Sequence, residues 1–315
     1  MGNYKYRFSL FTSTLNRCGH LAQRYEELKA QPFKDFEWVI VNDGSQDDTD
    51  NVVRKILAEG VIPVKYIPFP VNRGKHIAWR EALKVMQGRY VITVDDDDEI
   101  LKDTLSIHNM RWEELEKEAD YDKFWEVRTR CMIKDPETGE TRMTKLPSPI
   151  FDSDYIYVSY VLKVREEMNG SRKLEVLKEC AGVPPFKFEE HCSNLSEGIR
   201  WIRAARKYKT RFTEDSTRIY EPNPEGLCIS KPSKKKCWNS LVAAQLMLKE
   251  NPDILWKFDK LNYFRTIAIA GYKSAQLKLS VRQLNLTPGF TLLIWLMKKC
   301  SEIYLKVNRD KIPSM

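Results

Sequence analysis

The sequence predicts an α/β fold built on a largely parallel sheet. The first 100 residues alternate strand-like and helix-like stretches, which is the pattern of βαβ units joined by right-handed crossovers. Residues 36–41 are nearly all apolar, as in strands that are buried on both faces. The apolar residues 90–94 lead directly into four aspartates, Asp95 to Asp98. Because open α/β sheets bind ligands beyond the carboxyl ends of their strands, this fold class predicts a site at the acidic run.

Four strands and three helices account for the first 94 residues. We expect strands over residues 8–14, 36–41, 64–67 and 90–94, helices over residues 18–30 and 77–86, and between them a helix that ends at about residue 59. In the first helix Leu21, Tyr25 and Leu28 recur at helical spacing. Asp47, Asp48 and Thr49 offer caps for the second. The order β-α-β-α-β-α-β predicts a Rossmann-like sheet with helices on both faces.

The rest of the chain predicts a mixed sheet followed by a helical tail. Residues 123–133 and 141–145 flank a turn-rich segment, which indicates a hairpin, and residues 155–164 are rich in β-branched and aromatic residues, which indicates a further strand. Further helices are expected over residues 105–117, 196–207, 237–249, 262–275 and 289–306. We therefore expect one domain over residues 1–230, in two halves (1–100 and 101–230), and a C-terminal helical region over residues 231–315.

The positive charge of the chain is concentrated in that C-terminal region. The whole chain has a net charge of +8, yet residues 231–315 contain 16 Lys and Arg against 5 Asp and Glu. A basic segment rich in Leu, Ile, Trp and Tyr fits an anionic membrane surface better than nucleic acid, so no nucleic-acid partner is expected. The apolar run 290–297 is much shorter than the roughly 20 residues of a spanning helix. A helix packed on the rest of the protein and a helix lying in the membrane interface both remain open.

The cysteines and the N-terminus indicate a protein of the reducing cytoplasm. Seven cysteines form no C-x-x-C pair and no metal-like grouping with the four histidines, and residues 1–7 lead into a strand without the apolar segment of a secretory signal. We expect a cytoplasmic protein, peripherally associated with the inner face of the membrane.

Acidic side chains follow two of the expected strands. Asp43 comes after the second strand, and Asp95 to Asp98 come after the fourth. Mg²⁺ and Mn²⁺ need only one or two protein carboxylates when phosphates and water complete the shell. The two positions together predict a metal and nucleotide site, and the alternative is an acidic turn exposed to solvent.

Four segments in succession resemble the family 2 glycosyltransferases of the GT-A fold. They are residues 8–17, residues 38–49 with Asn42-Asp43-Gly44-Ser45, residues 72–78, and residues 88–98 with the acidic run. The resemblance implies an inverting glycosyltransferase that moves a hexose from a nucleoside-diphosphate sugar, most often a UDP-sugar, with Mn²⁺ or Mg²⁺. It further implies that a hydroxyl of a glycan or lipid-linked glycan accepts the sugar in surface polysaccharide synthesis. The resemblance is clear over residues 7–100, weaker to about residue 220, and absent from the tail.

The same resemblance assigns residues to the donor. Asp43 would accept a hydrogen bond from the nucleotide base, and Ser13 would lie near the base or the ribose. Asp95-Asp96-Asp97 stands at the family's D-x-D motif, where Asp97 is the first candidate for the metal and Asp95 or Asp96 would serve the ribose or a metal-bound water. Because the acidic run is continuous, the register is open by one residue, and Asp95 is the second metal candidate.

Two basic residues and one amide extend this donor site. Lys75 and His76 could place a cation and a hydrogen-bond donor beside the diphosphate, and their alternative role is a basic surface turn. Asn42 replaces the more usual aspartate of the family, and we expect its amide still to cap the following turn.

The general base has two candidates. Glu197 comes four residues before Trp201 and six before Arg203, which is similar to the family's E-D-x-x-x-W-x-R stretch with Glu197 in the place of its basic aspartate. An inverting transfer needs such a carboxylate to take the proton of the attacking hydroxyl. A first-turn glutamate is also a favourable partner of the helix dipole, and Glu190 is the second candidate.

Two rival functions stay open from the sequence. A sugar-phosphate nucleotidyltransferase would need a glycine-rich phosphate loop after the first strand, where residues 12–19 offer only Gly19. A non-catalytic GT-A-like binding module would keep the fold and lose the chemistry, and the retained aspartates argue against it.

Overall fold

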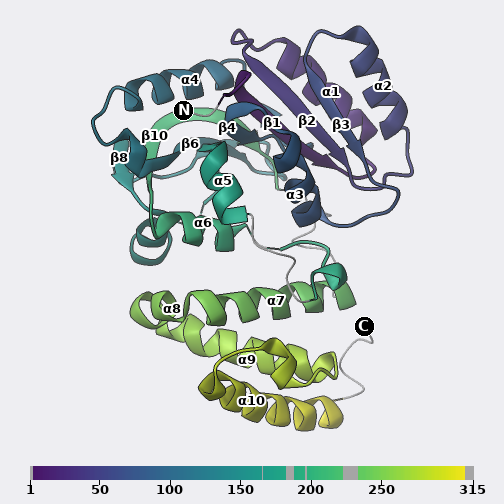
Figure 1. The fold of residues 1–315 in the computed structure, drawn as a ribbon, viewed down its shortest axis with the longest axis vertical. Coiled ribbons are helices and arrows are strands. Elements are labelled where there is room, and N and C mark those ends of the chain that lie inside the picture. Colours follow the sequence, from purple (N-terminus) through teal and green to yellow (C-terminus); the bar gives the residue numbers. More distant parts are fainter. Residues whose placement is uncertain (1–2, 165, 182–187, 196, 223–232, 309–315) are drawn as a thin grey trace. The chain divides into compact units, whose positions relative to one another are not determined.

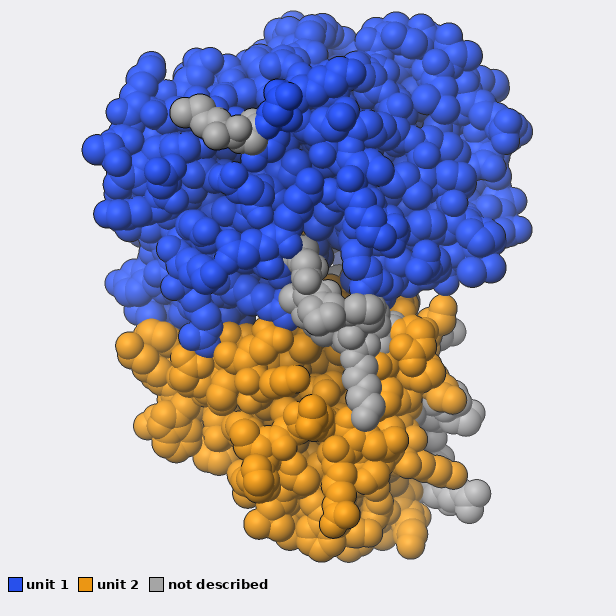
Figure 2. Space-filling model, viewed as in Figure 1, with its two compact units in different colours: residues 1–183, 200–229 blue, residues 184–199, 230–315 orange. Residues whose placement is uncertain are grey.

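The computed structural model describes residues 3–164, 166–181, 188–195, 197–222 and 233–308 (Figure 1). The chain divides into two compact units, which Figure 2 colours separately. Unit 1 comprises residues 1–183 and 200–229, and unit 2 comprises residues 184–199 and 230–315. Residues 184–199 therefore group with the C-terminal region.

Four parallel strands form the first part of the sheet in unit 1. β1 (Tyr6–Thr14) lies between β2 (Phe36–Asn42) and β4 (Gly88–Thr93), and β3 (Val64–Pro68) pairs with β2. The chain thus steps outward from β1 to β3 and then returns to the other side of β1 with β4. The predicted β-α-β-α-β-α-β order is confirmed.

Helices cover both faces of this sheet. α1 (Cys18–Lys29), α2 (Thr49–Glu59) and α4 (Thr104–Leu115) share one buried apolar cluster with the sheet. α3 (Lys75–Val85) and α5 (Leu174–Ala181) share a second cluster with it. The mixed α/β class with helices on both faces is confirmed.

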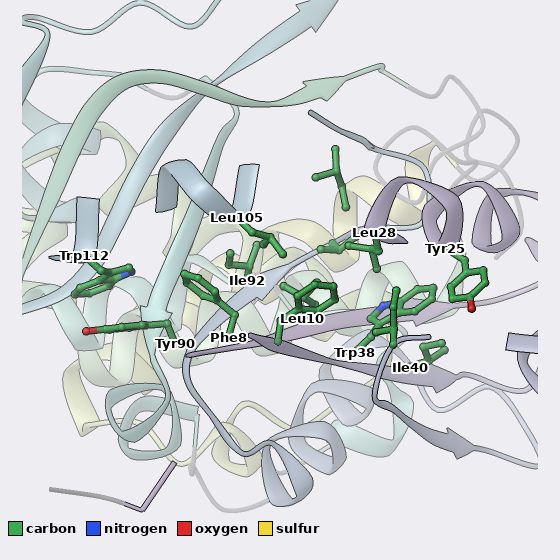
Figure 3. Packing of buried hydrophobic residues seen from close by; sticks show 14 of the residues in the cluster. Phe8, Leu10, Tyr25, Leu28, Trp38, Ile40, Tyr90, Ile92, Leu105 and Trp112 are labelled. Atoms are coloured by element: carbon green, nitrogen blue, oxygen red, sulfur yellow. The ribbon is translucent and has the colours of Figure 1, made fainter. Parts of the chain in front are cut away.

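The two clusters are separated by the alternation of side chains along each strand. Phe8 and Leu10 of β1 belong to the first cluster, and Phe11 belongs to the second, because successive side chains of a strand point to opposite faces. Figure 3 shows the first cluster, in which Trp112 of α4 stacks on Tyr90 of β4 with ring centroids 3.9 Å apart. Such large rings provide much of the apolar area that the fold buries.

The second half of unit 1 extends the sheet with strands of mixed direction. β9 (Met168–Lys173) runs antiparallel to both β4 and β6 (Phe124–Lys134), and β10 (Lys209–Tyr220) runs parallel to β6. The predicted hairpin is confirmed, with β7 (Thr141–Met143) antiparallel to β6. Two short strands, β5 (Glu99–Ile100) and β8 (Ile150–Ser153), pair antiparallel with β10.

The predicted strand over residues 155–164 was wrong. These residues contain a π-helical turn over Tyr157–Val161, and its start is stabilised by Asp154, whose Oδ1 accepts a hydrogen bond from the Tyr157 amide over 2.9 Å. A side chain that satisfies a backbone amide in this way favours a helical start over a strand. β-branched composition was therefore outweighed by local capping.

Unit 2 is helical. It contains a 3₁₀ turn at Glu189–His191, α7 (Lys234–Glu250), α8 (Pro252–Phe258), α9 (Lys260–Gln276), a 3₁₀ turn at Val281–Leu284 and α10 (Pro288–Val307). The three tail helices that the sequence predicts are present, and α8 was not predicted. α6 (Gly198–Ala205), which belongs to unit 1 from residue 200 onward, contains the predicted Trp201 and Arg203. Within the described ranges, no helix combines the length and the apolar character that crossing a bilayer requires.

Candidate functional site

The ends of β1, β2 and β4 meet at one edge of the sheet. Ser13 pairs with Val41 in the register of β1 and β2, and the Val94 amide donates to the Phe11 carbonyl over 2.8 Å. The order of the strands reverses between β1 and β4, which is the position where open α/β sheets bind ligands. The structure therefore brings Ser13, Asp43 and the start of the acidic run to the predicted edge.

Asp43 organises the loop that precedes α3. Its Oδ1 accepts a hydrogen bond from the Arg73 amide over 2.7 Å, and its Oδ2 accepts one from the Gly74 amide over 2.9 Å. The side chain is buried. This support of the loop was not predicted from the sequence, and the contact of Asp43 with a nucleotide base stays a prediction.

Gly44 lets the same loop approach the strand end. Its φ is +83°, and a Cβ at this position would lie 2.5 Å from the Val71 carbonyl carbon and 2.6 Å from the Asn72 nitrogen. A larger residue would meet both a strained backbone and a collision with backbone atoms. The glycine of the Asn42-Asp43-Gly44-Ser45 turn is therefore needed for residues 71–74 to pack against this turn.

Asn42 caps the turn as predicted. Its Oδ1 accepts a hydrogen bond from the Ser45 amide over 2.9 Å, and its Nδ2 donates to the Tyr66 hydroxyl over 3.0 Å. Ser45 in turn accepts a hydrogen bond from the Asn16 amide over 2.9 Å, and the Asn16 side chain accepts one from the Gln46 amide over 2.7 Å. The loops after β1 and β2 are thereby tied to each other.

The first three aspartates of the acidic run are paired with two cations. Lys75 Nζ lies 2.6 Å from Asp95 Oδ1, and one nitrogen of Arg17 lies 2.9 Å from Asp96 Oδ1 and 2.6 Å from Asp97 Oδ2. Burial alone would raise the pKa of Asp95, but Lys75, Arg218 and Arg17 hold it below its ordinary value. Burial raises the pKa of Asp96, against the opposing effect of Arg17. The run is a concentrated negative charge that requires cations nearby.

Asp98 belongs to a different environment from the other three aspartates. It is buried, and its Oδ2 lies 2.7 Å from a guanidinium nitrogen of Arg218 in β10. Burial raises its pKa to about 7, although Arg218 favours the charged form. Arg218 also donates to the sulfur of Cys131 and to the carboxylate of Glu167. We interpret Asp98 as an anchor of the acidic run to β10.

Arg17 and Arg218 were missed as site residues by the sequence analysis. Arg17 lies at the end of the first resembling segment, directly after Asn16. This position was the one feature of the sequence that could have indicated a site residue. Arg218 lies in a strand that was not predicted, 120 residues after its partner Asp98. No local pattern connects the two.

The donor set at the acidic run fits Mn²⁺ or Mg²⁺. The side chains of Asp95 and Asp97 are partly open to solvent, with 28% and 33% of their surface exposed, and carboxylate oxygens are the ligands these ions prefer. Among the residues that the structure describes, no three His, Cys, Asp or Glu side chains already converge on one metal position. Ions of this kind take most of their shell from phosphates and water, so one or two of these carboxylates suffice.

The remaining predicted residues are divided between the two units. Lys75 and His76 are the first residues of α3, and Lys75 lies beside the acidic run. Glu190 and Glu197 belong to unit 2. The Glu190 side chain is 69% exposed and lies 3.4 Å from the ring of His191, and Glu197 directly precedes α6. Their role as bases stays a prediction.

Trp201, the tryptophan that follows Glu197 in the stretch similar to the family's E-D-x-x-x-W-x-R, lies beside two arginines. Arg128 and Arg172 lie 4.9 Å and 5.7 Å from the ring of Trp201, and Tyr155 packs on the same ring at 5.2 Å. The two arginines share the buried carboxylate of Glu126. This network fixes α6 against the sheet of unit 1.

Comparison with known proteins agrees with this geometry. Residues 9–130 match the model of the family described as Glycosyl transferase family 2. These residues are a family 2 glycosyltransferase domain. Apart from residue 8, the match covers all four resembling segments, including Asp43, Lys75 and the acidic run.

Curated glycosyltransferases from bacteria are similar to this chain. A GalNAc(5)-diNAcBac-PP-undecaprenol beta-1,3-glucosyltransferase of Campylobacter jejuni is 29% identical over 100 residues, which are 32% of this chain and 32% of that protein. The chain thus matches about a third of this relative's length. An uncharacterized glycosyltransferase of Mycoplasma genitalium, MG025, is 25% identical over 309 residues and is matched over 94% of its length. A putative teichuronic acid biosynthesis glycosyltransferase of Bacillus subtilis, TuaG, is 31% identical over 106 residues, which are 33% of this chain and 41% of that protein.

Solved structures share the fold. The crystal structure of S. aureus TarS 1-349 in complex with UDP superposes with a TM-score of 0.56 at 17% identity, covering 94% of this chain and 88% of the TarS 1-349 chain. At this identity the likeness concerns the fold alone. The family 2 domain therefore adopts the GT-A fold.

Proposed function

We propose that this chain is an inverting glycosyltransferase that moves a sugar from a UDP-sugar to a hydroxyl of a glycan or lipid-linked glycan. The observation that carries the proposal is the meeting of Asp43, Lys75 and the acidic run at the edge of β1, β2 and β4, inside the family 2 domain. Residues 1–100 would hold the donor, and residues 101–230 would shape the acceptor side.

Four residues would bind the two parts of the donor nucleotide. Ser13 and Asp43 would contact the nucleoside, while Lys75 and His76 would contact the diphosphate. A fixed cation beside a diphosphate stabilises the charge that accumulates there as the sugar leaves. Lys75 is already held at the site by Asp95, so little reorganisation would be required.

Asp97 would hold Mn²⁺ or Mg²⁺, with Asp95 as the second candidate, and Asp95 or Asp96 would serve the ribose or a metal-bound water. The bound ion would neutralise charge on the diphosphate. Asp97 is our first candidate because it is the most exposed carboxylate of the three, while Asp96 is buried and Asp95 pairs with Lys75.

Glu197 or Glu190 would act as the general base. The carboxylate takes the proton of the acceptor hydroxyl, whose oxygen forms a bond to the anomeric carbon as the bond from that carbon to the diphosphate oxygen breaks. The nucleoside diphosphate leaves, and the configuration at the anomeric carbon inverts.

Two relatives support a role in surface glycan synthesis. The Campylobacter relative is named for an undecaprenol-linked glycan, and the Bacillus relative for teichuronic acid. TarS structures with UDP and with UDP-GlcNAc support UDP as the nucleotide to test first. We propose that the chain acts at the inner face of the membrane.

The proposal is tested by melting the purified protein with UDP, GDP or CDP, each with and without Mn²⁺. A nucleotide present at about 100 times its dissociation constant should stabilise the protein by roughly 2.7 kcal/mol. We expect the largest shift with UDP and Mn²⁺ together, and we expect Asp97→Ala to lose the part that depends on Mn²⁺.

Glu99→Ala is the matched control because Glu99 is an exposed acid two residues further along the chain. This variant should keep the full shift. If no nucleotide stabilises the wild-type protein, with or without Mn²⁺, the chain does not bind a nucleotide-sugar donor at this edge and the proposal fails.

A further inference from the structure

α10 exposes a continuous apolar face. Six of its exposed apolar residues lie on one side of the helix, because helix neighbours three or four positions apart share a side. They are Leu292, Leu293, Leu296, Ile303, Tyr304 and Val307, and we call them the outer face of α10. The exposed fractions reach 65% for Ile303 and 78% for Val307.

The opposite side of α10 provides the packing of unit 2. Ile294 is completely buried, and Phe290 contacts Tyr263 of α9 with ring centroids 5.9 Å apart. α9 and α10 approach so closely that a Cβ on Gly271 would lie 2.5 Å from the Met297 side chain. The outer face therefore contributes nothing to the core of unit 2.

Cationic and amphipathic side chains border the outer face. Lys299 and Lys306 are exposed on α10, and Trp295 is about half exposed, as is Tyr304 within the outer face. Tryptophan and tyrosine side chains prefer the headgroup level of a bilayer, and lysine stems can lie along apolar surface while the ammonium stays in water. The region 231–315 carries 16 Lys and Arg against 5 Asp and Glu.

We infer that the outer face of α10 inserts into the headgroup region of an anionic lipid bilayer, with the helix lying in the membrane plane. The apolar residues would enter the boundary of the acyl chains, while Lys299 and Lys306 would pair with anionic headgroups. Lys298, Lys299 and Glu302 in the middle of the helix are incompatible with a spanning orientation.

Charge favours a bilayer over a second copy of the chain. A twofold symmetric dimer places the same patch on both partners, so it would bring the lysines of one α10 toward those of the other. Glu302 is the one acid on α10 and already pairs with Lys298 and Lys299. An anionic headgroup layer offers the opposite charge, and this inference does not depend on the proposed transferase activity.

The experiment is sedimentation of the full chain with vesicles of synthetic phosphatidylcholine and phosphatidylglycerol in a 7:3 ratio (about 30% anionic lipid, as the charge effect requires). We expect the wild-type chain to bind these vesicles, and to bind them more weakly at high salt. Leu296→Asp with Ile303→Asp should reduce the partition coefficient at least about tenfold, since two apolar anchors are replaced by charges of the repelled sign. Lys299→Gln and Lys306→Gln should each reduce it about fivefold.

Leu57→Asp is the matched control, because Leu57 is an exposed apolar residue of α2 in unit 1. It should bind as the wild type does, and circular dichroism with a thermal melt should show that all variants fold. Equal binding of the Leu296→Asp/Ile303→Asp variant would overturn the inference. The inference would also be overturned if the wild-type chain did not bind the vesicles but formed a dimer, and the variant did not form that dimer. The vesicles contain neither nucleotide nor acceptor, so a failure here is independent of the donor-binding test.

Discussion

A single guanidinium balances the charge in the middle of the acidic run. Arg17 bridges Asp96 and Asp97, which places a cation where the proposed metal would also be attracted. In Arg17→Gln, Asp96 would keep its buried position without this partner. We expect the free energy of unfolding at pH 7 to fall by about 1–3 kcal/mol, measured by urea denaturation. Mn²⁺ alone should then raise the melting temperature more in Arg17→Gln than in the wild type, since the ion replaces the lost cation.

Lys29→Gln provides the comparison for this prediction. Lys29 pairs with Glu26 and Glu59 on the surface, where ion pairs contribute about 1 kcal/mol or less. This variant should lose little stability and respond to Mn²⁺ as the wild type does. The same response to Mn²⁺ in Arg17→Gln and the wild type would contradict the view that Arg17 and the metal compete for one place.

The sequence predicts single residues well where one segment contains the whole interaction. The Asn42 cap of the Ser45 amide spans three residues, and it was predicted and is present. The support of residues 73 and 74 by Asp43 joins loops 30 residues apart, and the pair of Asp98 and Arg218 spans 120 residues. Neither can be found from spacing, because the partners meet only after the sheet has formed.

The same difference appears among the strands. β1, β2 and β4 are apolar and were predicted within two residues of their ends. β9 and β10 were missed because their buried side chains include many polar ones. Arg172 of β9, for example, is buried against the carboxylate of Glu126 in β6, to which Thr210 of β10 also donates. A strand whose buried groups are ion-paired or hydrogen-bonded carries no apolar signal, so the mixed part of the sheet depends on pairing that the sequence does not display.

Gly44 lies in the loop that joins β2 to α2 at the site. Gly44→Ala forces a Cβ into the backbone of residues 71 and 72 at a positive φ. We expect it to lower the free energy of unfolding by about 2–3 kcal/mol, about 1 of it from the left-handed backbone and the rest from the displaced loop. Asp43 accepts hydrogen bonds from the displaced 71–74 loop, and Lys75 directly follows it. The affinity for UDP should therefore also fall, measured by titration calorimetry.

Gly60→Ala separates backbone strain from displacement. Gly60 ends α2 with a φ of +66°, and a Cβ there would contact nothing within 4 Å. This variant should cost only about 1 kcal/mol of stability and leave UDP binding unchanged. Equal UDP affinity in Gly44→Ala and Gly60→Ala would show that the 71–74 loop does not shape the nucleotide site.

For the whole molecule, the residues proposed to bind the donor and the residues proposed as the base are different ones. The residues proposed for the donor lie in unit 1, and both proposed bases lie in unit 2. Donor binding and sugar transfer should therefore respond to different substitutions. Asp97→Ala should weaken donor binding and transfer together, because a lost ligand for the donor lowers both.

Glu197→Gln should separate the two properties. The amide keeps the size of the side chain and cannot accept the proton, so we expect transfer to fall about 10²- to 10⁴-fold. The UDP shift in a thermal melt should remain, since Glu197 is not a proposed donor ligand. Glu190→Gln is the matched variant seven residues earlier in the same unit, and transfer is measured as UDP released from the UDP-sugar in the presence of acceptor. Loss of transfer in Glu197→Gln alone identifies Glu197 as the base, loss in Glu190→Gln alone identifies Glu190, and full transfer in both would show that neither carboxylate is the base.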